Sequence, residues 1–407
     1  MAFWRMLRKV RMWTQTPPEK RQAAFQLTDR EAFERLGSAC AHAPELVEAF
    51  GTFATLIRAP LRVDSDQLAE ACRLVYEWAD ARSMMDTAML FAEAASTVDP
   101  DNPARANDAG RMCRRATRDD RAADWYLRAF GLAVRTESRD ESLHALLGYG
   151  NLMKDLGRHD EAKTYFERAA QRAHNYGRLR QTGEAHHNLL AIAADFGSYY
   201  EGERHVRRAL ALYQTHHPRL AVLAHDWAFL LVRIQCYTPA MTLLEHAAPR
   251  AHTPDLQTLM WGTLARAAAG SRRRERFEHA KERLLPLTQA HEEYAAAALI
   301  HLAEGSRAFR DWDRAQAFAS SALEVAQRRK DALIERDAVQ LMEAISGREP
   351  APVEKDPPRA DRVARINEQT IARLQKWKAP SQVGPEASPR PTPSANRQVN
   401  QWPDPPV

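Results

Sequence analysis

The sequence predicts an all-α protein built from repeated helical hairpins. Alanine is abundant, whereas only 16 of the 407 residues are glycine, and this composition favours helix. Residues 143–156 and 160–173 both carry apolar side chains at helical spacing, with Gly157 between them. Small residues recur at regular intervals along the chain, and no part of it shows a convincing run of strands.

The hairpin at 143–173 shows how one unit of this pattern is built. Gly157 is expected to end the first helix, because a glycine just past a helix end can adopt the left-handed conformation that caps it. Asp160 and Glu161 then lie in the first turn of the second helix, where the helix dipole favours acids. Small residues, Gly150 and Ala162 among them, mark the points where the two helices must approach closely.

This pattern resembles the tetratricopeptide repeat, a family with small residues at repeat positions 8, 20 and 27. With Leu143 as position 1, the small sites are Gly150, Ala162 and Ala169. The large apolar or aromatic sites of that family are then occupied by Leu146, Tyr149, Met153 and Phe166. The resemblance implies a right-handed α-solenoid of stacked helical hairpins.

The same pattern recurs along the chain, which predicts about seven hairpins within residues 69–330. The repeats start near residues 69, 103, 143, 183, 221, 258 and 296. Position 27 is alanine in six of these seven copies. The copy at 258 departs from the pattern, since Phe277 and Leu284 stand at positions 20 and 27, and its register stays open.

Composition divides the chain into four segments. These are a basic amphipathic segment at 1–22, N-terminal capping helices at 23–68, the repeat array with a closing helix at 69–347, and a Pro-rich, disordered tail at 348–407. The capping segment is expected to form a hairpin of residues 29–42 and 44–58, opened by a capping box at Thr28 and Glu31. Residues 332–346 are expected to close the array.

Two terminal helices leave alternatives open. Within residues 1–13, the apolar residues fall on one helical face and basic residues lie opposite, so this helix either lies on a membrane surface or packs on the first hairpin. Residues 359–378 form a possible amphipathic helix, and a transient helix in the tail is favoured over a docked element.

The charge distribution argues against nucleic acid as a partner. The formal net charge is +5, but residues 1–22 contribute +5 and residues 348–407 contribute +3, so the body carries −3. Cys40, Cys72, Cys113 and Cys236 form no CxxC pair and are expected to be reduced core residues of a cytoplasmic protein. No apolar run reaches the roughly 18 residues of a membrane span.

The sequence offers no complete catalytic or metal-binding motif. Gly148 and Gly150 begin a pattern like a dinucleotide loop, but Met153 stands where the third glycine is required. Residues 291–295 begin like a zinc-protease helix and have Ala295 in place of the second histidine. We therefore expect no enzyme activity, no cofactor and no metal.

The family resemblance implies that ligands bind the concave face formed by the first helices, at repeat positions 2, 5, 9, 12 and 13. The candidate peptide- or protein-binding residues are Asn107, Arg111, Arg114, Arg115, Asn151, Lys154, His187, His225, Arg233 and Arg266. Residues 103–154 are locally basic on this face, which favours an acidic or C-terminal peptide segment as the ligand. The alternative is that these arginines form a solvated helix surface.

These observations predict a non-catalytic scaffold for protein–protein interaction that binds a peptide or protein segment in the concave groove. One alternative is a regulatory module that senses a peptide. Another is a membrane-peripheral assembly factor anchored weakly by residues 1–13. The expected location is cytoplasmic, with a membrane-peripheral one under the last alternative.

Overall fold

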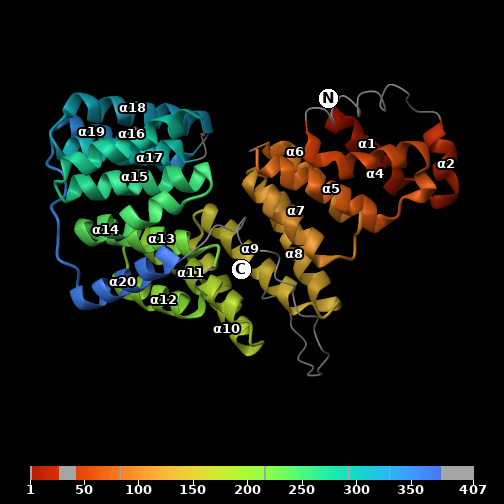
Figure 1. Cartoon of the computed structure of the whole chain (residues 1–407), viewed down its shortest axis with the longest axis horizontal. Coiled ribbons are helices and arrows are strands. Elements are labelled where there is room, and N and C mark those ends of the chain that lie inside the picture. The colour runs from red at the N-terminus through yellow and green to blue at the C-terminus, as the bar shows by residue number, and fades with distance from the viewer. Residues whose placement is uncertain are drawn as a thin grey trace. The chain divides into compact units, whose positions relative to one another are not determined.

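The computed structural model describes residues 2–26, 43–82, 84–214, 217–290, 294–329 and 331–376, and throughout these ranges the regular structure is helical (Figure 1). The chain divides into two compact units, which we call unit 1, up to Arg178, and unit 2, from Leu179. The all-α expectation is confirmed. The described part of the predicted capping hairpin, residues 43–58, lies in unit 1, and the described part of the predicted tail, residues 348–376, lies in unit 2.

Unit 1 contains the N-terminal helices and three hairpins. Its elements are α1 (Ala2–Gln15), α2 (Pro18–Gln26), η1 (Pro44–Leu46), α4 (Val47–Arg58), η2 (Pro60–Arg62), α5 (Ser65–Asp80), α6 (Met85–Val98), α7 (Pro103–Arg115), α8 (Asp119–Arg135), α9 (Arg139–Asp155) and α10 (His159–Asn175). The hairpins are α5–α6, α7–α8 and α9–α10. The predicted helix at 29–42, with Thr28, Glu31 and Cys40, lies outside the described residues.

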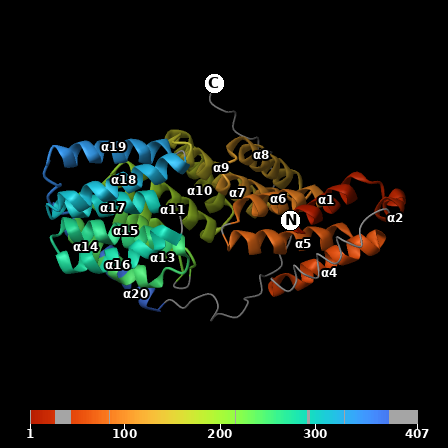
Figure 2. The same ribbon diagram turned by 90° about the horizontal axis from the view of Figure 1, so that it is seen from above.

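Unit 2 contains four further hairpins and two C-terminal helices. Its elements are α11 (Leu179–Asp195), α12 (Tyr199–Leu212), α13 (Leu220–Arg233), α14 (Tyr237–Ala247), η3 (Ala248–Arg250), α15 (Pro254–Gly270), α16 (Arg274–Ala290), α17 (Ala295–Ala308), α18 (Trp312–Arg329), α19 (Ala332–Ser346) and α20 (Ala360–Lys376). Helix α19 packs against α17 and α18 at one end of the unit (Figure 2).

The repeat register holds in all seven copies. The second helix of every hairpin begins sixteen residues after the repeat start, at Met85, Asp119, His159, Tyr199, Tyr237, Arg274 and Trp312. The copy at 258 is therefore in register, although Phe277 and Leu284 occupy its small sites and are buried. Gly305 on the next first helix makes room for Phe277, because a Cβ at Gly305 would overlap the Phe277 ring.

Close helix approach explains the small residues. A Cβ added at Gly150 would lie 2.6 Å from Cε1 of Phe166, nearer than real Cβ atoms come to a neighbour. Ala162 is completely buried and Ala169 nearly so. Each side chain at these sites therefore lies at a point where the first and second helices of a hairpin are in contact, as the sequence predicts.

In the six hairpins whose turns are fully described, the turn uses one left-handed residue at repeat position 15. Gly157 has φ +73°, and the amide of Arg158 donates to the carbonyl of Met153 at 2.9 Å, which closes the helix end. Position 15 also has positive φ at Thr117, Gly197, Gln235, Arg272 and Arg310. Four of the six described copies therefore hold a non-glycine residue in a conformation that favours glycine.

The apolar face of α1 is buried within unit 1. Met6, Leu7, Val10 and Trp13 pack towards α4 and α6, and the Trp13 indole donates to the carbonyl of Pro60 at 3.1 Å. The structure thus has the packed arrangement, and the face that the sequence offered to a membrane is covered. In the described part of the chain, no helix has the length and apolarity that crossing a bilayer requires.

The described cysteines are core residues. Cys72, Cys113 and Cys236 are free thiols, and all three are buried. Burial is the main reason that the pKa of the Cys113 thiol is raised to about 12, with nearby Glu93 adding to the effect. These thiols are therefore protonated and poorly reactive at neutral pH.

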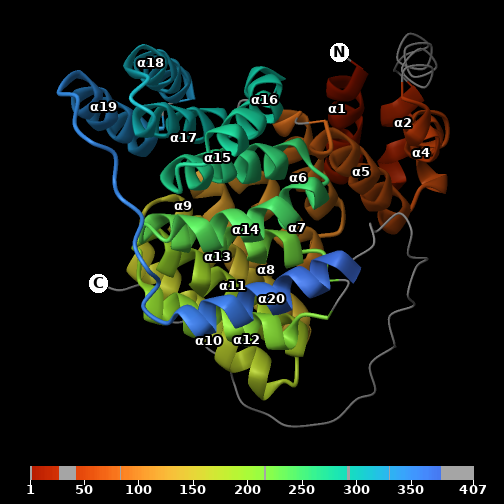
Figure 3. The same cartoon turned by 60° about the vertical axis from the view of Figure 1, so that its left-hand side comes forward.

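The predicted tail does not begin at residue 348. Residues 348–376 belong to unit 2, where α20 packs against α13 and α14 and bonds to α12 (Figure 3). Helices α12 and α14 have 14 and 11 residues, whereas α16 has 17, so two second helices of this unit are short where α20 packs. Residues 377–407 lie outside the described residues.

Replacing Ala162 by Phe should lower the stability of unit 1 by about 1–3 kcal/mol, because the added ring has no space between α9 and α10. Chemical denaturation of the purified chain measures this change. Glu167→Phe adds the same ring at an exposed site of α10 and should leave the midpoint nearly unchanged. Equal midpoints for the two variants would contradict the predicted helix contact.

Thr117→Gly should raise stability by about 1 kcal/mol, because a β-branched residue at φ +53° is strained and glycine is not. Gly157→Ala should lower stability by a similar amount for the converse reason. Thermal unfolding of the two single variants and the double variant tests this. A lower melting temperature for Thr117→Gly would show that the threonine makes compensating contacts.

Candidate functional site

The ten predicted binding residues lie on first helices of both units. Unit 1 holds six of them on α7 and α9, namely Asn107, Arg111, Arg114, Arg115, Asn151 and Lys154. Unit 2 holds His187, His225, Arg233 and Arg266 on α11, α13 and α15. The first-helix face of each unit is described separately below.

The arginines of unit 1 are paired with acids from neighbouring helices. Arg114 Nη1 lies 2.5 Å from Asp155 Oδ2, which joins α7 to the end of α9. Arg115 pairs with Asp80 of α5, and Arg111 lies 3.7 Å from the same carboxylate. The guanidinium groups therefore join adjacent repeats to one another.

The amide and lysine of this face are also engaged or flanked by acids. Asn107 is 8% exposed and donates to the backbone carbonyl and to Oε2 of Glu141, at 3.0 and 2.8 Å. Lys154 Nζ lies 3.9 Å from Asp155 Oδ1. Asn151 is half-buried beside them on α9. Asn107 is therefore committed to the contact between α7 and α9.

The charges on this face balance. The cations are Arg73, Arg105, Arg111, Arg114, Arg115 and Lys154. The acids paired with them are Glu70, Glu77, Asp80, Asp108 and Asp155. A sixth acid, Glu141, contacts Asn107 and His144 on the same face. Six cations face six acids, so the basic surface expected from residues 103–154 is neutralised. The positive charge of α7 and α9 taken alone is balanced by acids of the neighbouring helix α5.

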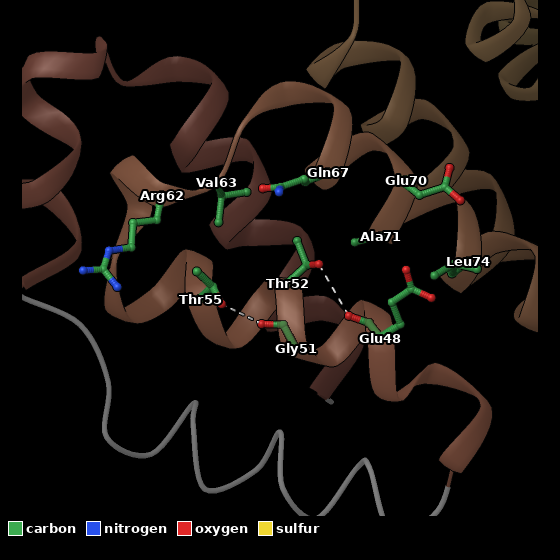
Figure 4. Close-up of a pocket in the computed structure, with 10 residues that line it drawn as sticks. All are labelled: Glu48, Gly51, Thr52, Thr55, Arg62, Val63, Gln67, Glu70, Ala71 and Leu74. Carbon is green, nitrogen blue, oxygen red and sulfur yellow. Dashed lines mark hydrogen bonds between the residues drawn. The ribbon is translucent and has the colours of Figure 1, made fainter.

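A hollow of about 450 Å³ lies between α4 and α5 (Figure 4). Glu48, Thr52, Thr55 and Glu70 contribute to its lining, and the two threonine hydroxyls donate to backbone carbonyls of α4. A hydrogen bond from Arg73 is the main reason that the pKa of Glu70 is lowered to about 2. Since the two threonine hydroxyls and Glu70 already have partners, they do not form a free, convergent set for a ligand.

Unit 2 has a buried polar chain between its first helices. Asp226 of α13 is hydrogen-bonded to His187 Nε2 and to His225 Nδ1, both at 3.0 Å. The other ring nitrogens lie 3.0 Å from the Tyr213 hydroxyl and 3.1 Å from the Thr263 hydroxyl, so each imidazole links Asp226 to a further residue. Burial would raise the pKa of Asp226, but the two histidine hydrogen bonds hold it well below its usual range.

Thr263, His225 and Asp226 follow the order hydroxyl, imidazole, carboxylate that nucleophilic enzymes use. Thr263 is only 1% exposed, however, and its hydroxyl also lies 3.0 Å from the carbonyl of Leu259. A substrate cannot reach this hydroxyl, so the chain connects helices. Among the described residues, no group of three or more His, Cys, Asp or Glu is placed to hold a metal ion.

The polar chain follows a rule of the repeat. In unit 2 the residue at position 6 of one repeat bonds to position 5 of the repeat before it, as Asp226 does to His187 and Thr263 does to His225. The next such pair would be His301 and Gly262, but glycine has no side chain. Accordingly, Nδ1 of His301 is buried and has no hydrogen-bond partner among the described residues.

Aromatic and charged side chains from α13, α15 and α17 lie around His301. The Phe229 ring stacks near His225 at 6.1 Å and meets His301 edge-on at 6.3 Å. Burial lowers the pKa of His301 well below its usual range, and Arg266 and Arg233 lower it further, so the imidazole is neutral. We name the surface of Phe229, Arg233, Arg266, His301 and Glu304 the Phe229 face.

The arginines of the Phe229 face are less fully paired than those of unit 1. Arg266 Nη2 lies 3.8 Å from Glu304 Oε1, beyond hydrogen-bond distance, and Arg233 donates to the carbonyl of Asp195 at 3.0 Å. Gly262 lets α15 approach α17, since a Cβ there would come within 3.3 Å of Ala298. A guanidinium, a neutral imidazole and an aromatic ring thus converge on one surface.

Of the ten predicted residues, the structure brings His225, Arg233 and Arg266 together, and it buries His187 in the polar chain. His301, Asp226 and Thr263 are not among the predicted residues, because they stand at position 6. One signal was present in the sequence: position 6 is polar in five of seven copies, namely Asp108, Asn188, Asp226, Thr263 and His301. Polar residues recurring at one repeat position indicate contacts between repeats.

No protein-family model and no curated protein matches this sequence. Among solved structures, the chain is similar to Cut9 in the APC/C hetero-tetramer Cut9–Hcn1, with 14% identity, a TM-score of 0.51, and coverage of 84% of this chain and 62% of that chain. It is also similar to the Rap conjugation gene regulator of plasmid pLS20 in complex with the Phr* peptide, with 13% identity, a TM-score of 0.42, and coverage of 89% and 97%. For PilF of Pseudomonas aeruginosa the identity is 17%, the TM-score 0.40, and the coverage 56% and 96%.

The chain shares with Cut9 the fold of an α-helical repeat protein, and its hairpins follow a tetratricopeptide-like pattern. At such low identity the likeness concerns the fold.

Unit 2 should lose stability at mildly acidic pH. Burial lowers the pKa of His186 and His217 to about 4 and that of His205 to about 3, from 6.5. The unfolded chain therefore binds protons below pH 6.5 that the folded unit does not, so this stability is complete above pH 6.5 and is lost as the pH falls towards 4. The lowered imidazole pKa values found in the described residues all belong to unit 2.

Hydrogen exchange corrected for intrinsic rates, at pH 7 and pH 5, should show faster opening of unit 2 and little change in unit 1. His217→Gln removes one of the buried imidazoles and should reduce the pH effect, whereas His246→Gln, at a half-buried site of α14, should not. Equal acid sensitivity of the two units would contradict the assignment.

Proposed function

We propose that the protein is a non-catalytic scaffold for protein–protein interaction, and that it binds a peptide or protein segment on the Phe229 face of unit 2. The observation that carries this proposal is the incompletely paired guanidinium of Arg266, whose Nη2 lies 3.8 Å from Glu304 Oε1, together with the half-buried ring of Phe229. A charged donor without a close acceptor can form a short hydrogen bond with a carbonyl or carboxylate oxygen of a bound segment.

The chemistry of this face defines the kind of segment. Phe229 offers a ring for an apolar or aromatic side chain. Arg266 has only a distant ion pair with Glu304, so its guanidinium is suited to donate hydrogen bonds to a carbonyl or carboxylate oxygen of the ligand. This preference replaces the wholly acidic ligand suggested by the arginines of unit 1.

The other interpretations differ in their support. The residues of unit 1 remain candidates for a weaker, second contact, with Asn151 and Lys154 the least committed among them. The peptide-sensing alternative stays a prediction, and small-angle scattering with and without a bound segment would test it. The membrane-peripheral alternative loses its anchor, because α1 uses its apolar face inside unit 1.

A comparative affinity capture tests the proposal. Phe229→Asp with Arg266→Glu should abolish recovery of partners that wild type retains, as measured by quantitative mass spectrometry of native lysate. Leu333→Asp with Arg336→Glu makes the same changes of side-chain class on α19, at exposed positions away from this face, and should retain the partners. Partners lost only when Arg111, Arg114, Asn151 and Lys154 are replaced by alanine would move the site to unit 1.

A further inference from the structure

A second binding surface lies on the opposite side of α13. Trp227 is two residues from both His225 and Phe229, so it projects about 200° around the helix from them. Its side chain is fully buried and bonds to Asn367 of α20. Helix α20 packs on α13 and α14 and bonds to α12 (Figure 3), and we call the surface of these three helices that it covers the groove between α12 and α14.

The first contact in the groove is a buried anion. Glu203 of α12 is 2% exposed, and its carboxylate accepts from Arg362 at 2.8 Å and from Arg359 at 3.2 Å. Burial would raise the pKa of Glu203, but these two arginines lower it, so the carboxylate is ionised. Arg359 also lies over the ring of Tyr200, 5.0 Å from its centroid. This end of the groove is suited to guanidinium groups.

Asn367 provides the central contact. The Trp227 indole donates to Asn367 Oδ1 at 3.1 Å, and Asn367 Nδ2 donates to the carbonyl of Pro239 at 2.8 Å. Around it, Val363, Ile366 and Leu374 are buried against α13 and α14. One amide therefore satisfies a donor of α13 and an acceptor of α14 at the same time.

The far end of the groove uses free helix ends. Arg373 donates to the carbonyls of Leu210 and Tyr213 at the end of α12, which have no partner within that helix. In return, Arg250 donates to the carbonyl of Leu374 near the end of α20 at 2.7 Å. The groove thus recognises the charge of a helix, its central amide and the direction in which the helix runs.

These contacts differ from those between the helices of the repeats. Repeat helices meet at alanine and glycine. Helix α20 buries apolar residues as well, but it also makes hydrogen bonds through long side chains such as Arg362, Asn367 and Arg373. Residues 348–359 connect it without a regular helix, and the hydrogen bonds that hold this connector include Lys355 N to Gln235 O at 2.9 Å and Thr238 N to Glu354 Oε1 at 2.6 Å.

We propose that the groove between α12 and α14 is a binding site for an amphipathic helix of a partner protein, and that α20 is its exchangeable resident. The partner helix carries two arginines one turn apart at its start, an asparagine about five residues later, and apolar residues at the spacing of Val363, Ile366 and Leu374. This site is separate from the Phe229 face, so the two proposals stand or fall independently.

The test uses a fluorescent peptide of residues 359–376 and the full chain. In the variant Arg359→Glu/Arg362→Glu, the resident helix meets Glu203 with like charge and is released, so the peptide should bind. Wild type should bind it on the order of 100-fold more weakly, because its own helix competes at an effective concentration of about 1 mM. Adding Glu203→Gln to the variant should weaken binding of the peptide by about tenfold, since a charged hydrogen-bond acceptor is lost.

Arg365→Glu/Lys376→Glu is the matched control, since it makes the same charge change at exposed positions of α20 and should behave like wild type. A released variant that melts like wild type but fails to bind the peptide would overturn the proposal. Hydrogen exchange of wild type is a second measurement that needs no variant. Residues 360–376 should open before α13 and α14, and opening only together with those helices would overturn it as well.

Discussion

The close approach of two helices within each hairpin is the constraint on which the structure depends. Where Gly150 meets the Phe166 ring, no Cβ fits, and Ala162 is completely buried nearby. This contact fixes the distance between helices and so the start of the second helix in every repeat. When Phe277 occupies a small site, Gly305 on the neighbouring helix supplies the space, so the constraint is kept by a different pair of residues.

Polar contacts add a second level of organisation, from one hairpin to the next. In unit 2 an ionised Asp226 lies between two histidines, and in unit 1 ion pairs such as Arg114 with Asp155 have the same role. Buried pairs of this kind stabilise less than apolar packing, but breaking one leaves an unpaired charge, so they specify the register of the stack. The Phe229 face lies where such pairs end.

Helix α20 belongs to a different class of contact. Its arginines and Asn367 make side-chain hydrogen bonds beside buried apolar residues, whereas the repeat helices pack mainly through alanine and glycine. The same unit therefore combines a helical stack with a further helix that is attached in part by polar contacts. The two proposed surfaces lie on opposite sides of α13, so a ligand of the first helices and an occupant of the groove would not compete directly.

The repeat pattern by itself determined the fold, because helical periodicity, small residues and turns act over at most one hairpin. The register at 258 was settled only by the structure, where Gly305 makes room for Phe277. The net charge of the first-helix face in unit 1 does not follow from the sequence of one repeat, since Asp80 and Asp155 neutralise arginines that lie tens of residues away in the chain. The docking of α20 was hidden by its proline-rich surroundings, because an amphipathic helix needs a complementary groove to be stable. Only the tertiary structure decided these features, since each depends on pairing groups from distant segments whose separation in space no local pattern encodes.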